Sequence, residues 1–395
     1  MTLGTLDRVR AGRGPLERCT GDPRAFLADA WGRRARVRPG AEPGGFDDLL
    51  TLDDVDRFLT TTALRTPFFR LVEAGEQIPE SAYTRGGRTG SREVQGIADP
   101  ARVAALFEGG ATIVLQGLHR WSEPVARFCR DLELEIGHPC QVNAYVTPPG
   151  AQGLDQHEDP HDVFVLQAFG RKRWEVHAAP REEPRAPLDA EIGAGDTIYM
   201  PAGTPHAARA QAVLSGHLTV GVHVATWREV VTGVVGRALA GRDDPVAAGW
   251  TEDTEAFAKE LEGHLETVRS LLGEVDARRE AEDRRERFLS NRAQIARGTV
   301  AGRSAPPVVT DETVVRHRPG AVCELRRRDD LLVALLGDRR LEMPAWLEPA
   351  MRRIAATPGG FAVRELAGEL PDPAGRAILV RRLIRESLLT AAGER

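Results

Sequence analysis

The sequence predicts an α+β fold with a β-sandwich or jelly roll at its centre and helices before and after it. Residues 141–226 contain five short β-rich runs, separated by Gly, Pro and Asp with no long helix between them. Helical periodicity is confined to the segments before residue 137 and after Trp227. The chain of 395 residues, 42% of them hydrophobic, is long enough for two or three domains.

Composition points to an ordinary water-soluble protein. The net charge of -5 with 28% charged residues lacks the basic excess of a dedicated nucleic-acid binder. The four cysteines lie far apart without a CxxC pair, which favours free thiols over a disulfide framework or a thiolate zinc site. No apolar run approaches the ~20 residues that span a bilayer, and the N-terminus does not resemble a secretory signal. We therefore expect a cytoplasmic protein that does not enter a membrane.

The first 110 residues are expected to wrap the central sheet with short elements. Apolar spacing and capping residues predict helices at 26–31, 51–59 and 99–110, and a Gly-rich polar stretch predicts a loop at 83–96. The second of these helices is expected to be capped by Thr51 or Asp53. A buried strand at 111–118 and a helix at 122–137 that stops at Gly137 complete this part.

The central strands follow from short apolar runs with alternating side chains. They are expected at 141–148, 161–170, 171–178, 195–203 and 217–226.

Beyond the central strands, one long helix is indicated by an apolar stripe at spacings of three and four. The stripe consists of Phe257, Leu261, Leu265, Val268, Leu272 and Val275. It predicts packing either on the neighbouring domain or on a second subunit, and the sequence does not decide between these. Residues 277–287 are expected to form a solvated helix or a helix end.

A Pro-containing linker at 300–310 precedes a small C-terminal α/β unit. The unit is expected to contain strands at 314–318 and 331–337 and helices at 346–356, 363–370 and 374–388. Helices flanked by short strands suit a winged helix. Arg381, Arg382 and Arg385 near one face of the last helix suit DNA binding, or simply a solvated surface, so we expect no nucleic-acid partner.

One group of residues in the central region has the side chains of a metal-binding site. His157 and Asp159 are two residues apart, so on a strand their side chains would point to the same side. His206 follows a later predicted strand and would return to the same sheet. Two imidazoles and one carboxylate bind one face of a ferrous ion and leave the opposite positions open. The sequence therefore predicts a non-haem iron site.

Other residues near this constellation are interpreted differently. His161 is an alternative ligand, but it follows Pro160 and would be poorly placed. Glu158 alternates to the opposite face. The remaining histidines of this region, His177, His217 and His223, are interpreted as ordinary sheet residues.

The segment 143–176, with N-x-Y-x-T-P-P-G-x-Q-G, H-x-D and D-V-F-x-L-Q-x-x-G-x-K-R-W, followed by 195–208, resembles the JmjC-type cupin oxygenases. Within these it is most similar to the ribosomal oxygenases, which hydroxylate arginine or histidine side chains of ribosomal proteins. The resemblance implies a double-stranded β-helix, then a helical dimerisation region and a C-terminal winged helix. The implied domains are 1–228, 229–300 and 301–395, and the implied assembly is a homodimer.

The resemblance also assigns roles to residues. It implies Fe(II), the cosubstrate 2-oxoglutarate and O2, with no catalytic residue beyond the metal ligands. The implied iron ligands are His157, Asp159 and His206; Lys172 would pair with the distal carboxylate of 2-oxoglutarate; and Asn143, Tyr145 and Thr219 would line the cosubstrate pocket. A cation for a dianionic ligand is physically sensible. Trp174 is expected to belong to the barrel core.

The chain departs from the family pattern at the approach to the iron. Position 161 is His, where the family commonly has an aromatic residue. Asp155, Glu158 and Asp162 are expected to give the approach a negative bias, which would steer a cationic side chain to it. The expected function is hydroxylation of an Arg or His side chain of a protein, possibly ribosomal. The alternatives are a tailoring hydroxylase of a peptide or small molecule, and a non-catalytic cupin that binds DNA through the winged helix.

Overall fold

The computed structural model describes residues 13–40, 45–151, 155–209, 212–292, 300, 308–318 and 320–391, so the predicted linker lies mostly outside the described residues. Contacts divide the chain into two units, residues 1–224 and 225–395, and each is described by itself. Among the described helices, none combines the length and the apolar composition that crossing a bilayer requires.

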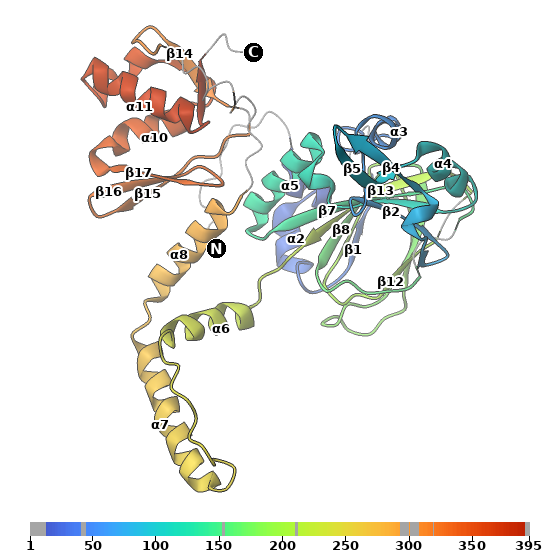
Figure 1. The fold of residues 1–395 in the computed structure, drawn as a ribbon, viewed down its shortest axis with the longest axis horizontal. Helices are drawn as coiled ribbons and strands as arrows, with labels where there is room; N and C mark the ends of the chain where they lie inside the picture. The colour runs from blue at the N-terminus through green and yellow to red at the C-terminus, as the bar shows by residue number, and fades with distance from the viewer. Residues whose placement is uncertain are drawn as a thin grey trace. The chain divides into compact units, whose positions relative to one another are not determined.

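The first unit is built on two antiparallel sheets (Figure 1). Their strands are β1 (Arg36–Arg38), β2 (Phe69–Glu73), β3 (Glu76–Gln77), β6 (Thr112–Leu115), β7 (Cys140–Thr147), β8 (Asp162–Phe169), β9 (Arg171–Val176), β10 (Leu188–Gly193), β11 (Thr197–Met200), β12 (His206–Arg209) and β13 (Ser215–Val222). The larger sheet has the order β1-β11-β8-β13-β7-β6-β2-β3, and the smaller sheet has the order β10-β9-β12. The predicted jelly-roll core is confirmed.

Strand β8 is buried on both faces and separates two apolar cores. Val163 and Val165 pack in the cluster that joins the two sheets. Phe164 and Leu166, which alternate with them, pack in the larger cluster beneath the helices. The uninterrupted apolar run of β8 follows from this double burial, because a strand covered on both faces needs no polar side.

Short helices cover the outer face of the larger sheet. They are α1 (Pro15–Thr20), α2 (Pro23–Asp29), α3 (Leu52–Thr61), α4 (Pro100–Glu108) and α5 (Glu123–Ile136), with single turns η1 (Glu80–Ala82) and η2 (Leu118–Arg120). Thr51 caps α3 in a capping box with Asp54. Helix α5 ends at Gly137, whose φ of 74° is left-handed and suits glycine. The helices predicted at 26–31, 51–59, 99–110 and 122–137 are confirmed to within a few residues.

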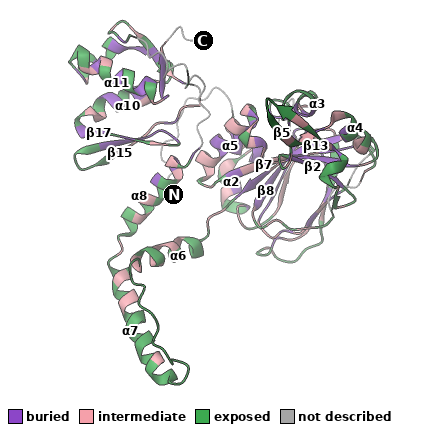
Figure 2. Cartoon of the chain, viewed as in Figure 1, coloured by how far each residue is buried: buried purple, intermediate pink, exposed green. Residues whose placement is uncertain are grey.

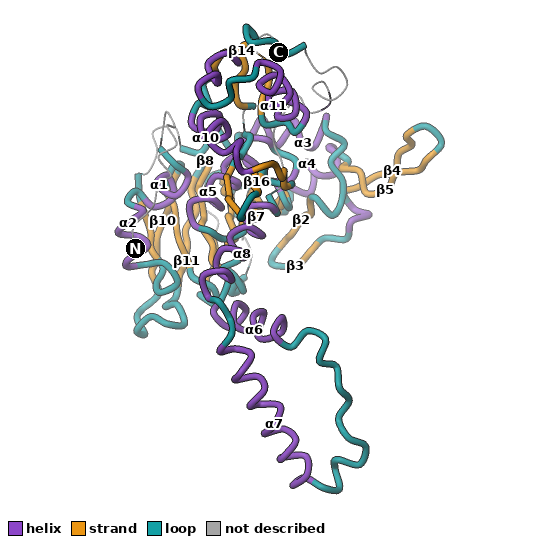
Figure 3. Tube along the Cα trace, turned by 90° about the vertical axis from the view of Figure 1, so that its left-hand side faces the viewer, coloured by secondary structure: helices purple, strands orange, loops and turns teal. Residues whose placement is uncertain are grey.

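The loop predicted at 83–96 is wrong, because this segment forms a two-stranded hairpin. It consists of β4 (Thr84–Thr89) and β5 (Arg92–Ala98), which extends from the rest of the unit (Figure 3). The turn contains Gly90 at a φ of 60°, a conformation that favours glycine. The glycines indicated the turn correctly, but the β-branched residues Val94 and Ile97 beyond it were a strand signal.

The second unit begins with three helices, α6 (Trp227–Ala238), α7 (Thr254–Gly273) and α8 (Ala277–Ser290). Helix α7 contains the predicted apolar stripe as far as Leu272 and ends before Val275. None of its residues is buried within the described chain, as its colours in Figure 2 show. Leu261 and Leu265 are 45% and 47% exposed, so half of each side chain faces solvent.

The C-terminal part of the second unit has its own apolar core. It contains β14 (Val314–His317), β15 (Glu324–Arg328), β16 (Leu331–Leu335), β17 (Arg340–Pro344), η3 (Ala345–Leu347), α10 (Glu348–Ala356), β18 (Phe361–Ala362), η4 (Val363–Gly368), α11 (Pro373–Arg385) and β19 (Leu389–Ala391). The strands form the sheets β18-β14-β19 and β15-β16-β17. The helix predicted at 363–370 is a shorter 3-10 turn. The strand at 340–344 was not predicted, because its run of five residues is half exposed.

A buried hydrogen-bond chain ties the N-terminal helices to the larger sheet. The hydroxyl of Tyr199 donates to the Asp162 carboxylate and accepts from the backbone N–H of Gly32 at 2.7 Å. Tyr199→Phe is expected to lower the free energy of unfolding by about 1–3 kcal/mol, because a buried carboxylate loses its donor. Urea unfolding measures this, and an unchanged midpoint would show that the bond adds nothing to stability.

Candidate active site

His157, Asp159 and His206 lie together at the edge of the two sheets. One ligand atom from each of the three lies within 4.8 Å of the others. His157 and His206 face each other across a single antiparallel bridge, with backbone N–O distances of 3.0 and 2.9 Å. The expectation of a regular strand at His157 and Asp159 is wrong, because Pro160 has no N–H to continue a ladder. The bridge holds the segment together with one further backbone bond, in which the N–H of Gly203 donates to the carbonyl of Asp159 at 2.8 Å.

Backbone carbonyls fix the orientation of both imidazole rings. Nδ1 of His157 donates to the Asp155 carbonyl at 2.7 Å, and Nδ1 of His206 donates to the Thr204 carbonyl at 2.9 Å. Carbonyls only accept, so the proton is on Nδ1 and Nε2 is free for a metal. Nε2 of His206 is 3.8 Å from Oδ2 of Asp159. Burial is the main cause that lowers the pKa of His206, which favours the neutral form that metals bind.

All seven residues predicted for the site line one pocket between the two sheets. Asn143 and Tyr145 come from β7, Lys172 from β9 and Thr219 from β13, and the pocket also includes the three residues described above. The register pairs Thr219 with Asn143 across β13 and β7, which places both side chains on one face. The distant segments of the sequence thus meet through strand pairing.

Lys172 is a buried cation without an anionic partner. It is 2% exposed, and its Nζ donates to the hydroxyl of Thr147 at 3.1 Å. Among the described residues, no carboxylate lies within 4.0 Å of it. Burial lowers the pKa of Lys172 to about 8. A charge of this kind is stabilised when an anionic ligand enters the pocket.

Polar side chains of β7 are held by their neighbours. Oδ1 of Asn143 accepts from the backbone N–H of Gly117 at 2.9 Å. Burial raises the pKa of Tyr145, and hydrogen bonds with Thr219 and Asn143 oppose that rise. Tyr145 is therefore a neutral phenol that can donate to a ligand.

Among the further residues that line the pocket, three carry ring nitrogens and were not assigned to the site by sequence reasoning: His161, Trp174 and His217. Trp174 belongs to the core between the sheets as expected, but it borders the pocket as well. The available signal was the alternation along each strand, since Trp174 lies two positions after Lys172 and His217 two positions before Thr219.

The expectation for Asp162 at the approach is wrong. Asp162 is buried, and its carboxylate accepts from Tyr199 and from the backbone N–H of Ala202 at 2.9 Å. Asp155 and Glu158 are exposed. A negative approach therefore depends on these two residues alone.

Comparison with known proteins identifies relatives of the central region. Residues 119–230 match the family model described as "JmjC domain". The chain is 29% identical over 225 residues to "Ribosomal oxygenase 1" of Gallus gallus, covering 52% of this chain and 36% of that protein. It is 29% identical over 217 residues to "Bifunctional lysine-specific demethylase and histidyl-hydroxylase NO66" of Drosophila mojavensis, covering 50% and 23%. The chain thus spans well under half the length of these relatives.

Similar solved structures extend the likeness to nearly the whole chain. The Escherichia coli ribosomal oxygenase YcfD has a TM-score of 0.54 at 18% identity, covering 94% of this chain and 98% of that one. Its complex with cobalt and 2-oxoglutarate has a TM-score of 0.55 at 18% identity, with the same coverage. At this identity the likeness shows a common fold.

Proposed function

We propose that the chain, whose residues 119–230 match the JmjC domain model, is an Fe(II)- and 2-oxoglutarate-dependent dioxygenase that hydroxylates an amino-acid side chain of a protein. The observation that carries this proposal is the pocket itself. It combines two imidazoles and a carboxylate with a buried cation, Lys172, that has no anionic partner among the described residues. The names of the relatives, ribosomal oxygenase and histidyl-hydroxylase, support the same reaction class.

His157, Asp159 and His206 fit a ferrous ion. Their donor set is the two-histidine, one-carboxylate type that leaves positions open for further ligands. Iron with 2-oxoglutarate and O2 supplies the oxidation of a C–H bond to an alcohol, with release of succinate and carbon dioxide. The protein's part is to hold the ring orientations through the carbonyls of Asp155 and Thr204 and to exclude water from the pocket.

Lys172 would hold the distal carboxylate of 2-oxoglutarate. Thr147 accepts one of the three N–H donors of the ammonium, which leaves donors for the ligand. Tyr145, Asn143 and Thr219 would orient the same ligand from the opposite sheet. A pocket closed by two sheets strengthens these contacts because water is excluded.

Affinity for 2-oxoglutarate is expected to fall as pH rises through about 8. Burial holds the pKa of free Lys172 at about 8, so the ammonium is fully present below that value and is lost above it. Each pH unit above 8 should raise the dissociation constant about tenfold, because the proton must be taken up on binding. Anaerobic titrations from pH 6.5 to 9.5 measure this. A flat profile over that range would contradict the role of Lys172.

The substrate that we propose is an arginine or histidine side chain of a ribosomal protein. The names of the relatives support it, and the exposed carboxylates of Asp155 and Glu158 suit a basic protein. The purified protein is incubated with ribosomal proteins, Fe(II), 2-oxoglutarate and O2, and mass spectrometry looks for a gain of one oxygen. We expect a ribosomal protein to gain one oxygen when it is incubated with the original enzyme and to gain none with the His206→Ala variant. Succinate formation without a gain on any ribosomal protein would favour a peptide or small-molecule substrate instead.

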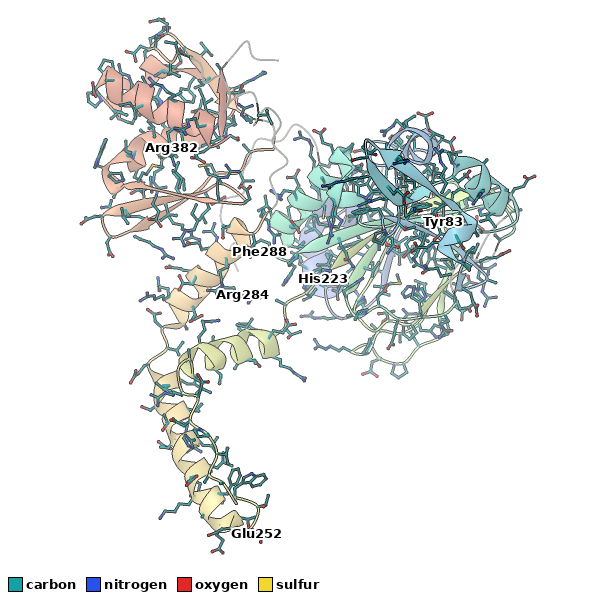
Figure 4. All side chains as sticks on the ribbon, viewed as in Figure 1. Tyr83, His223, Glu252, Arg284, Phe288 and Arg382 are labelled. Atoms are coloured by element: carbon teal, nitrogen blue, oxygen red, sulfur yellow. The ribbon has the colours of Figure 1, made fainter. Side chains whose placement is uncertain are left out.

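The second unit is proposed to pair with a second copy and to carry a winged helix. Helix α7 leaves Leu261 and Leu265 of its apolar stripe 45% and 47% exposed within the described chain, which supports a homodimer contact in the region 229–300. The order α10, β18, η4, α11, β19 in the described part of 301–395 supports a winged helix. Arg382 of α11 (Figure 4) is ion-paired with Glu386, so its charge is partly neutralised, which supports a solvated face rather than a DNA contact. Light scattering measures the oligomeric state, and a monomer would contradict the proposed homodimer.

We also propose a cytoplasmic location.

A further inference from the structure

The pocket contains two buried side chains whose nitrogen atoms lack hydrogen-bond partners among the described residues. Trp174 and His217 are each 3% exposed, and both line the pocket. Nε1 of Trp174 and Nδ1 of His217 are buried without a partner. An unsatisfied buried polar group costs about 1–3 kcal/mol, so such groups are kept mainly where a ligand or water satisfies them.

His217 lies between the two ends of the proposed cosubstrate site. The ring of Trp174 stands edge-on to that of His217 at 5.2 Å and lies 6.0 Å from the ring of His206. Lys172 is two positions before Trp174 on β9, so both side chains point to the same side. A ligand that reaches from the metal ligands to Lys172 therefore passes Trp174 and His217.

The ring of His217 is neutral and fixed in place. Burial first, then the positive charge of Lys172 and the nearby imidazole of His206, lower the pKa of His217 well below its ordinary value. The ring stacks on Tyr145 with centroids 5.1 Å apart and an angle of 6° between the planes. The register of β13 and β7 pairs the same two residues. A neutral imidazole offers one N–H donor, and here its position is set before any ligand binds.

We propose that a ring N–H of His217 donates a hydrogen bond to the distal carboxylate of 2-oxoglutarate, beside the ammonium of Lys172. This inference rests on the proposed function and adds a binding residue to it. A carboxylate has enough lone pairs to accept from both groups at once. The neutral donor sets the position of the carboxylate, while Lys172 supplies the charge. His217 thereby makes the pocket selective for a 2-oxo acid that carries a second carboxylate.

The test compares two substitutions at one position by ligand binding rather than turnover. His217→Phe keeps a ring that can stack on Tyr145 but removes the donor, and His217→Asn keeps a donor but removes the ring. Anaerobic titration of the Fe(II)-loaded protein with 2-oxoglutarate follows the weak charge-transfer absorption of the chelated complex. Pyruvate, which has the same chelating end and no distal carboxylate, serves as the matched ligand. Thermal unfolding and Fe(II) binding establish that each variant is folded; if the phenylalanine variant is not, His217→Leu takes its place.

The phenylalanine variant is expected to bind 2-oxoglutarate at least about tenfold more weakly, as loss of a hydrogen bond to a charged group predicts. The asparagine variant should stay within about threefold of the original protein, and pyruvate binding should be unchanged in both. Equal binding of 2-oxoglutarate by the phenylalanine variant and the original protein would overturn the proposal. The proposal would also be overturned if the phenylalanine variant bound pyruvate and 2-oxoglutarate more weakly by the same factor, because His217 would then act by packing. If the original protein shows no 2-oxoglutarate complex at all, the proposed function itself fails, and that result is separate from either outcome.

Discussion

His206→Ala is expected to abolish iron binding and turnover together. His206 is buried, its ring is oriented by the Thr204 carbonyl, and it supplies one of only three protein donors. Loss of an outer partner of a metal ligand already weakens metal binding by about 10–100-fold, so loss of a ligand itself should exceed about 100-fold. Anaerobic dialysis against Fe(II), followed by metal analysis, measures the affinity directly.

The control for this variant is His264→Ala. His264 is exposed on α7 in the second unit, so its loss removes an imidazole without touching the pocket. The control should bind iron like the original protein. Retention of tight iron binding by the His206 variant would refute the assignment of the three ligands, while loss in both variants would indicate binding elsewhere.

Lys172→Ala is expected to retain iron and lose affinity for 2-oxoglutarate. Truncation leaves the distal carboxylate of the ligand buried without a cation, which costs about 2–5 kcal/mol and raises the dissociation constant at least about 30-fold. Turnover should recover at high 2-oxoglutarate, because the group binds the cosubstrate and not the reacting carbon. Titration of initial rates with 2-oxoglutarate separates an increased KM from a reduced kcat.

Arg171→Ala is the matched control for Lys172. Arg171 is the preceding residue on β9, but it points to solvent and pairs with Glu191 at 3.2 Å. Its removal takes away the same charge one position along the strand and should leave KM for 2-oxoglutarate unchanged. If both variants behave alike, the effect comes from net charge and not from the pocket.

The sequence predicted the central strands because alternation is a local property, and the resemblance to the JmjC oxygenases implied which of their residues line the pocket. Asn143 with Tyr145, and Lys172 with Trp174, share a face through spacing alone. The pairing order of the strands is not local. That β9 lies opposite β8 in a separate sheet, and that His157 bridges to His206, depends on contacts between distant segments.

Three sequence-based expectations differ from the structure, and each difference has a physical cause. Asp162 looks like an approach residue when only the charges near His157 are counted, but Tyr199 from another strand turns it inward. His217 looks like an ordinary sheet histidine because nothing in its own strand reveals that its ring nitrogen lacks a partner. Glycines at 86–90 suggested a loop, although the strands on either side of them pair. The first two cases concern partners on other strands, whereas the hairpin is a local pairing that the glycines of its turn obscured.

The bridge between His157 and His206 has a consequence for how the protein acquires its metal. The third donor is synthesised well after the first two, so a growing chain cannot assemble the complete donor set until β12 has left the ribosome and paired. Binding of iron by all three donors then requires β12 to be in place. At a free iron concentration of about one hundred times its dissociation constant, binding would add about 2.7 kcal/mol to the stability of the folded state.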